Sequence, residues 1–239
     1  MSESQLRKSM GAGVAFVVLL VAGVMFTFGN SPETKSSDTP AQAANKWIEY
    51  LSSSSHRTGL IIGAYLLIVA AIAFVWFSTG LREWFAPDSG TGRIMSALGV
   101  LGAGAIAVAA MTGGVEVAGG IAFGNEALPV NGDALRLVAD MFFPLIFVVF
   151  GLVSAALIGL VAFLSLRERR APAWLGYTAW LGALGALVGV FFFPFVIALL
   201  WYLAIAIAGL AGAASTLGGA DSEVGTAPRA QPTGATSNP

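Results

Sequence analysis

Long runs of apolar residues alternate with short polar segments along most of this chain. A helix rises about 1.5 Å per residue, so roughly 20 apolar residues cross a hydrocarbon layer of about 30 Å. The pattern predicts an all-α fold, a polytopic transmembrane helical bundle with one transmembrane domain over residues 1–214. Six spans are predicted, at residues 10–28, 58–79, 94–112, 139–166, 173–192 and 195–214.

The last two predicted spans come from a single apolar stretch. Residues 172–214 contain no charged side chain, and one helix of that length would reach roughly 64 Å, about twice what a bilayer needs. Proline disrupts the preceding helical turn and disfavours helical geometry at the residue before it. We therefore expect the chain to fold back at Phe193-Pro194.

The first span has an alternative interpretation as a secretory signal peptide. Arg7 and Lys8 precede the apolar run, and Ala41-Gln42-Ala43 resembles the small-residue site at which signal peptides are cleaved. However, the run is longer than the usual 7 to 15 residues, and the site lies more than ten residues beyond its end. An uncleaved membrane anchor explains both features better.

Composition supports a membrane location and excludes an ordinary soluble enzyme. Hydrophobic residues make up 56% of the chain and charged residues only 10%, against about 25% charged in soluble domains. The formal net charge of -1 gives no sign of a nucleic-acid partner. The chain has no cysteine, which removes disulfides, thiolate metal sites and thiol nucleophiles. The lipid bilayer is the one partner that composition predicts.

Basic residues fall unevenly on the two sides of the predicted spans. With the N-terminus inside, eight Lys and Arg are cytoplasmic and four are outside, so the positive-inside rule predicts both termini in the cytoplasm. The inner set is Arg7, Lys8, Arg82, Arg93, Arg167, Arg169, Arg170 and Arg229, and the outer set is Lys35, Lys46, Arg57 and Arg136.

The first outer loop, residues 30–57, contains a predicted amphipathic helix. Thr39-Pro40 is a good helix start, with a capping hydroxyl and proline at the first helical position. Apolar residues then recur at helical spacing at Ala44, Trp47, Ile48 and Leu51. We expect a connector on the outer membrane face, with Trp47 and Tyr50 at the interface. The alternatives are a lid over a cavity and a docking site for a partner.

The second outer loop and the C-terminus contain few apolar runs. Glycine pairs flank Glu116 at residues 113–114 and 119–120, so a re-entrant dip by residues 114–123 is an alternative to a plain extracellular loop. Residues 215–239 are rich in Gly, Ala, Ser, Thr and Pro, which predicts a disordered cytoplasmic tail.

Asp140 and Glu116 are the candidate functional carboxylates. Asp140 lies about one turn into the fourth predicted span, where an acidic residue is costly unless it is paired or hydrated. Arg136 precedes it by four residues, so the two side chains share a helical face and are expected to form an ion pair near the outer interface. If the third helix continues past Thr112, Glu116 would lie near the same level, and the two carboxylates could line a cavity that opens outward.

The rest of the predicted membrane interior is poor in chemistry-bearing groups. Its main polar residues are Tyr65, Ser96, Ser154, Tyr177, Thr178 and Tyr202. The sole histidine, His56, is expected to be an interfacial polar residue, and neither a catalytic motif, nor a cofactor motif, nor metal-ligand spacing is present in the sequence. This scarcity argues against an ion-coupled pump.

Small residues at four-residue spacing predict close helix packing. Such spacing occurs at Gly59 and Gly63, at Gly151, Ala155 and Gly159, and at Gly185 and Gly189. Packing within the chain is the expected role, and a dimer interface is the alternative. Trp180 and Trp201 lie deep in their spans and are expected to be packing residues as well.

The C-terminal third resembles a known class of proteins. Arg169-Arg170-Ala171-Pro172-Ala173-Trp174-Leu175-Gly176, followed by Phe192-Phe193-Pro194 and Leu200-Trp201, is similar to the last two spans of bacterial multi-pass membrane proteins of actinobacterial type and unknown function. The excess of nine Arg over three Lys suits such an origin. The resemblance covers about 45 residues and implies only location and topology, so no catalytic residue is carried over.

The sequence therefore predicts a non-enzymatic accessory or interaction component of a bacterial cytoplasmic membrane. Its partner would be another membrane protein or a second copy of the chain. The alternative is a small transporter or sensor that uses Glu116 and Asp140 in an outward-facing cavity, and an enzyme acting on lipid is a more distant third.

Overall fold

The computed structural model describes residues 3–29, 31–33, 35, 37–87, 89–112, 118, 132–168, 173–191 and 193–220, and all regular secondary structure in them is helical. The elements are α1 (Glu3–Gly29), α2 (Pro40–Ser52), α3 (Ser54–Phe85), α4 (Gly90–Ala110), α6 (Gly132–Asp140), the π-helix η1 (Pro144–Phe150), α7 (Gly151–Glu168), α8 (Ala173–Leu187), the 3-10 turn η2 (Gly189–Phe191) and α9 (Phe193–Ala220). The prediction of an all-α bundle is confirmed.

Five helical segments in the described residues are long and apolar enough to cross a membrane, which makes the chain a multi-pass membrane protein. They are Ser4–Gly29, Ser54–Phe85, Gly90–Ala110, Asp133–Arg167 and Phe193–Gly212. The difference from six predicted spans lies in α8. This helix has 15 residues, so it spans about 22 Å and is shorter than the hydrocarbon layer.

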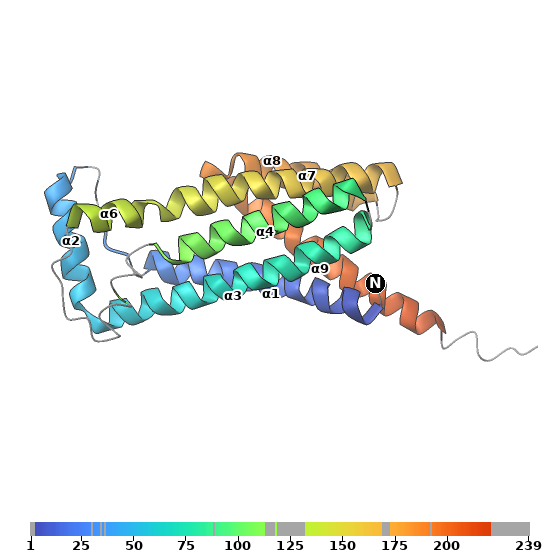
Figure 1. Cartoon of the computed structure of the whole chain (residues 1–239), viewed down its shortest axis with the longest axis horizontal. Helices are drawn as coiled ribbons and strands as arrows, with labels where there is room; N and C mark the ends of the chain where they lie inside the picture. Colours follow the sequence, from blue (N-terminus) through green and yellow to red (C-terminus); the bar gives the residue numbers. More distant parts are fainter. Residues whose placement is uncertain are drawn as a thin grey trace, which may run out of the picture.

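The long helices extend along one axis, and α2 crosses that axis at one end of the bundle (Figure 1). Helix α1 packs against α3 and α9, α4 packs against α3 and α7, and α8 lies against α7 and α9. The N-terminus lies at the opposite end, beside the last turns of α9 (Figure 1). We call these two ends the α2 end and the terminal end.

The apolar stretch at residues 172–214 is divided between α8 and α9, which pack against each other. Helix α8 ends at Leu187 and α9 begins at Phe193, so the break lies slightly before the expected Phe193-Pro194. Pro194 lies in the first turn of α9, where a missing N–H breaks no helical hydrogen bond. Trp201 is buried and its Nε1 donates to the carbonyl of Leu175 at 3.3 Å, which confirms it as a packing residue. Trp180 is 52% exposed, so its predicted packing role is wrong.

Several helices extend beyond the apolar runs that predicted them. Helix α3 begins at Ser54 instead of Thr58, and α9 continues to Ala220, so residues 215–220 are helical and not part of a disordered tail. An apolar run measures the thickness of hydrocarbon, whereas a helix continues into the interface until a cap or a breaker ends it. The rest of the predicted tail, residues 221–239, lies outside the described residues.

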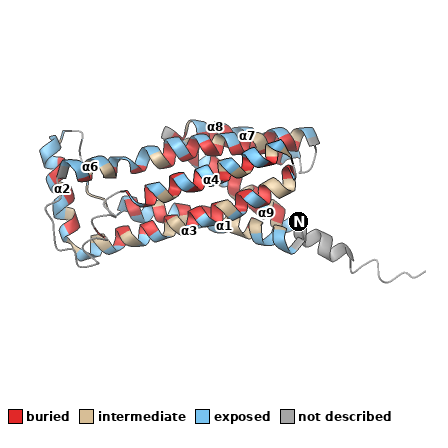
Figure 2. Ribbon diagram, viewed as in Figure 1, coloured by how far each residue is buried: buried red, intermediate tan, exposed pale blue. Residues whose placement is uncertain are grey.

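Fully buried aromatic rings fill the middle of the bundle. Figure 2 shows that buried residues occupy the helix faces that turn inward. The centroid of the Phe74 ring lies 4.7 Å from that of Phe16, 5.3 Å from that of Phe150 and 5.9 Å from that of Tyr202. Phe77 adds an edge contact to Tyr202 at 5.8 Å. We call these five residues, from α1, α3, η1 and α9, the aromatic core.

Glycine lets α1 and α3 approach each other closely. A Cβ atom added at Gly63 would lie 2.8 Å from Thr27 Oγ1, 3.2 Å from Thr27 N and 3.3 Å from the carbonyl oxygen of Gly23. The other predicted small-residue contacts also pack within the chain at Gly151, Gly185 and Gly189, whereas Gly159 faces open space. The expected intramolecular role is therefore confirmed for most of these positions.

Replacing Gly63 by Ala is expected to destabilise the bundle by about 1–3 kcal/mol, because the new methyl group overpacks the contact between α1 and α3. Thr27 has little freedom to move, since its hydroxyl donates to the carbonyl of Gly23 at 2.9 Å. The free energy of unfolding in mixed micelles measures the effect. Gly104→Ala is the matched control, because a Cβ there meets no atom within 4 Å. Equal stability of the two variants would contradict the packing argument.

Candidate functional site at the α2 end

Helix α2 begins and ends with satisfied backbone groups. Thr39 Oγ1 accepts from Gln42 N at 3.3 Å and Gln42 Oε1 accepts from Thr39 N at 2.8 Å, which is a complete capping box with Pro40 at the first position. At the other end, Arg57 Nη1 donates to the carbonyls of Leu51 at 2.6 Å and Ser52 at 2.9 Å. The predicted helix start is confirmed, and α2 is held at both ends.

The apolar face of α2 packs on protein. Helix α2 contacts α6, and Trp47 and Leu51 are buried. Trp47 is therefore not a membrane anchor, because the end of the bundle provides an apolar surface that covers it. Tyr50 stacks on the ring of His56 with centroids 3.7 Å apart, and His56 Nδ1 lies 3.1 Å from the carbonyl oxygen of Tyr50. Burial raises the pKa of Tyr50.

An ion pair ties the loop before α2 to the helix. Lys46 Nζ donates to Asp38 Oδ2 at 2.7 Å and to the carbonyl of Glu33 at 3.1 Å. Asp38 Oδ2 also accepts from the backbone N–H of Lys35 at 2.7 Å. The hydrogen bond from Lys46, supported by that from Lys35, lowers the pKa of Asp38 below its ordinary value.

The predicted ion pair between Arg136 and Asp140 is confirmed, with Arg136 Nε 3.5 Å from Asp140 Oδ2. The helical segment begins at Gly132, so Asp140 is the last residue of α6 and lies about two turns into the apolar segment Asp133–Arg167. Its side chain is 66% exposed. The carboxylate borders a cavity of about 200 Å³ that Trp47 and Phe28 also line. Asp140 is therefore an accessible, charge-paired group beside a small cavity.

The second candidate carboxylate, Glu116, lies outside the described residues, as does the proposed re-entrant segment 114–123. The pairing of Glu116 with Asp140 therefore stays a prediction.

Six hydroxyl-bearing side chains are buried among the described residues: Thr27, Ser78, Thr112, Ser154, Ser165 and Tyr202. Ser154 and Tyr202 are fully buried, and neither side-chain oxygen has a hydrogen bond of ordinary geometry within the described part of the chain. Tyr65 and Tyr177, which the sequence placed among the interior polar groups, are exposed on the outside of the bundle. The buried hydroxyls therefore coincide only in part with the interior polar residues that the sequence suggested.

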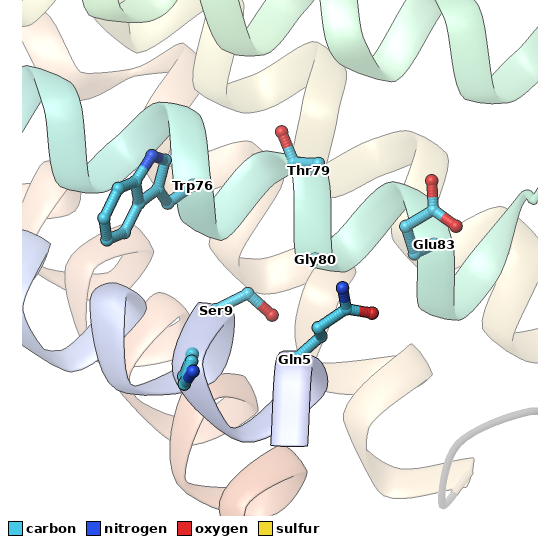
Figure 3. A pocket seen from close by; sticks show the side chains of 7 residues that line it. Gln5, Ser9, Trp76, Thr79, Gly80 and Glu83 are labelled. Atoms are coloured by element: carbon cyan, nitrogen blue, oxygen red, sulfur yellow. The ribbon is translucent and has the colours of Figure 1, made fainter. Parts of the chain in front are cut away.

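A cavity that the sequence did not predict, lined mainly by polar residues, lies between α1 and α3 at the terminal end (Figure 3). Its volume is about 660 Å³. The residues that line it are Gln5, Lys8, Ser9, Trp76, Thr79, Gly80 and Glu83. We call this cavity the terminal groove. The sequence did contain a sign of this cavity, because Trp76, Thr79 and Glu83 recur at helical spacing and share one face of α3.

Lowering the pH is expected to release the segment before α2. The pKa of Asp38 is lowered in the fold, so its pairing with Lys46 contributes stability at pH values above the ordinary pKa of 3.8. This contribution is lost as the pH falls through the lowered pKa. Hydrogen exchange of the α2 amides should show protection near neutral pH that declines below about pH 3.8.

The Asp38→Asn variant should show weak protection of α2 at every pH. Glu49→Gln, which removes an exposed carboxyl group on α2, is the control and should keep the wild-type pH profile. Identical profiles for the wild type and Asp38→Asn would contradict the role of the pair.

Comparisons with known proteins found no relative from which a function could be carried over to this chain. Neither a family model, nor a curated protein, nor a solved structure matches this chain. The resemblance of the C-terminal third to bacterial membrane proteins therefore stays a prediction.

Proposed function

We propose that this chain is a non-enzymatic integral membrane protein that acts by binding another membrane protein or a second copy of itself. The observation that carries this proposal is the closed interior. A transporter needs a polar route through the membrane, and polar groups at membrane depth mark such routes. Here the aromatic core fills the centre of the bundle, and its five rings are fully buried.

The packed α2 and α6 helices, together the α2–α6 pair, are proposed as the contact surface. The inner face of α2 is buried on the bundle, and both helix ends are held by hydrogen bonds. Its outer face exposes Asn45 and Glu49 beside Ile48, and α6 exposes Leu137. A rigid surface of mixed polar and apolar residues loses little conformational freedom on binding, which favours recognition of a partner.

We further propose six crossings with both termini in the cytoplasm of a bacterial cell. Helix α8 would be a short sixth crossing between α7 and α9, in a locally thinned bilayer. Basic residues support this orientation, because Arg82, Arg93 and Arg167 lie at the helix ends of the terminal end, where the positive-inside rule expects them. The position of the N-terminus beside the last turns of α9 (Figure 1) agrees with an even number of crossings.

Single cysteines test the contact surface, because the chain contains no cysteine of its own. With a bifunctional maleimide-based cross-linker in native membranes, Asn45→Cys on α2 should capture a specific partner or a second copy. Lys35→Cys, at an exposed residue of the loop before α2 and outside the α2–α6 pair, is the matched control and should not. Labelling of Asn45→Cys by an impermeant maleimide in intact cells would also place the α2 end outside.

Recovery of the Asn45→Cys protein without an adduct, and of the wild type as a lone monomer in mild detergent, would count against an interaction role.

A second candidate function is a small-ligand sensor at the α2 end. The cavity of about 200 Å³ beside Asp140 supports it, since the carboxylate is both accessible and held by Arg136. Under this alternative, Asp140 would bind a cationic solute or a proton from outside. Glu116 would contribute if it lies nearby.

Asp140→Asn separates the two candidates. If the chain acts by interaction alone, the substitution should leave solute flux and pH response in reconstituted vesicles unchanged and should leave cross-linking at Asn45→Cys intact. The matched control is Asp133→Asn, at an exposed carboxyl group of the same helix. Loss of a pH response or of flux in Asp140→Asn alone would support the sensor or transporter and contradict the leading proposal.

A further inference from the structure

The terminal groove lies at the level where the apolar parts of α1 and α3 both end. The apolar run of α1 begins at Met10, and that of α3 ends near Thr79. The two helices are in register there, because a Cβ atom at Gly80 would collide with the side chain of Ser9. A membrane places its headgroups at the ends of the apolar run. The groove therefore opens among phospholipid headgroups, whichever side of the membrane the terminal end occupies.

Two opposite charges line the groove. Lys8 extends from α1 and Glu83 from α3. Arg82 Nε lies 3.8 Å from Glu83 Oε1, which is a long ion pair. The Arg82 side chain packs near Gly92 on α4, where an added Cβ would lie 3.3 Å from its Cγ, and it does not line the groove. A zwitterionic group could pair its negative charge with Lys8 and add its positive charge to the long pair at Glu83.

The hydroxyl groups of the groove act as hydrogen-bond acceptors. The hydroxyl of Ser9 donates to the carbonyl of Leu6 at 2.9 Å, and that of Thr79 donates to the carbonyl of Val75 at 2.8 Å. Each hydroxyl has one proton and two lone pairs. Because both protons are used within their own helices, the oxygens can offer only lone pairs to a ligand. Together with the Glu83 carboxylate they suit a group that donates several hydrogen bonds, such as a primary ammonium.

An exposed apolar stripe on α3 leads from the membrane to the groove. Tyr65, Val69, Ile72 and Trp76 follow one another at spacings of three or four residues, and all four side chains are exposed. The stripe continues into Thr79 and Glu83. In Figure 3, Trp76 lies at one end of the groove and Glu83 at the other. The two residues are seven positions apart, which corresponds to about 10 Å along a helix. An acyl chain can therefore lie along the stripe while its headgroup enters the groove.

We propose that the terminal groove binds the phosphoethanolamine headgroup of a membrane phospholipid. The phosphodiester pairs with Lys8. The primary ammonium donates hydrogen bonds to Glu83 and to the hydroxyl oxygens of Ser9 and Thr79. The volume of the terminal groove, about 660 Å³, lies in the range of about 300–1,000 Å³ that is usual for small-molecule pockets. This inference needs the membrane location of the chain and does not depend on the proposed interaction function.

The lining distinguishes this headgroup from two common alternatives. A choline headgroup has a quaternary nitrogen without an N–H, so it cannot donate to Glu83 or Thr79. A glycerol headgroup has no positive charge, so it would bring its phosphate near the Glu83 carboxylate without an ammonium between them. Primary amine and phosphodiester together match the groove, and the order of affinity is expected to be phosphatidylethanolamine first, then phosphatidylcholine, then phosphatidylglycerol.

Native mass spectrometry of the detergent-solubilised full chain tests the proposal, with titration by dioleoyl lipids that differ only in headgroup. The wild type should bind phosphatidylethanolamine about tenfold more tightly than phosphatidylcholine, which is the factor that one lost charge-assisted hydrogen bond produces. Glu83→Gln and Thr79→Val should reduce this preference. Lys8→Gln should weaken binding of all three lipids, and phosphatidylethanolamine should still bind more tightly than phosphatidylcholine.

Matched controls carry the same changes at the α2 end. Lys35→Gln and Glu49→Gln should bind the three lipids as the wild type does. Equal affinity of the wild type for the three lipids, or an unchanged preference in Glu83→Gln with normal melting, would overturn the proposal. Saturation by water-soluble glycerophosphoethanolamine at the affinity of the lipid would overturn the assignment to a membrane lipid. Failure of the cross-linking at Asn45→Cys would bear on the interaction function alone.

Discussion

Helices in a hydrocarbon layer gain little from replacing lipid contacts by contacts with each other, because lipid tails are as apolar as their side chains. This bundle therefore depends on close packing. Between α1 and α3, the absence of a side chain at Gly63 lets the backbone of α1 approach to van der Waals contact. In the centre, rings such as Phe74 and Tyr202 fill the space with edge and tilted contacts. The same packing that replaces a hydrophobic driving force also fills the centre of the described bundle with buried rings.

A closed interior moves the polar chemistry of this chain to its two ends. At the α2 end, hydrogen bonds and ion pairs such as Lys46 with Asp38 hold a short helix across the bundle. At the terminal end, Lys8 and Glu83 border a groove between two helices. Water and headgroups at these levels solvate charges that the hydrocarbon would penalise. Recognition of proteins or lipids at the ends is thus the kind of function that we propose for this bundle.

The features that the sequence predicted correctly depend on residues close together in the chain. The start of α2 follows from Thr39, Pro40 and Gln42, which are within one turn of each other. The pairing of Arg136 with Asp140 follows from a spacing of four residues on one helix. The fold-back of the last apolar stretch follows from its length alone.

The features that the sequence did not reveal depend on which face of each helix turns inward. In a soluble protein the polar face marks the outside, but in a membrane the lipid-facing and core-facing sides are equally apolar. For this reason Trp180 could not be distinguished from Trp201, although the first is exposed and the second buried.

The sequence by itself thus determined the class of protein, the helices and the local caps and pairs, because length, spacing and charge act within a few residues. Only the tertiary structure decided that Trp47 packs inward, that the centre is closed by rings, and that Lys8 and Glu83 share a groove, because these depend on contacts between helices that are distant in the chain.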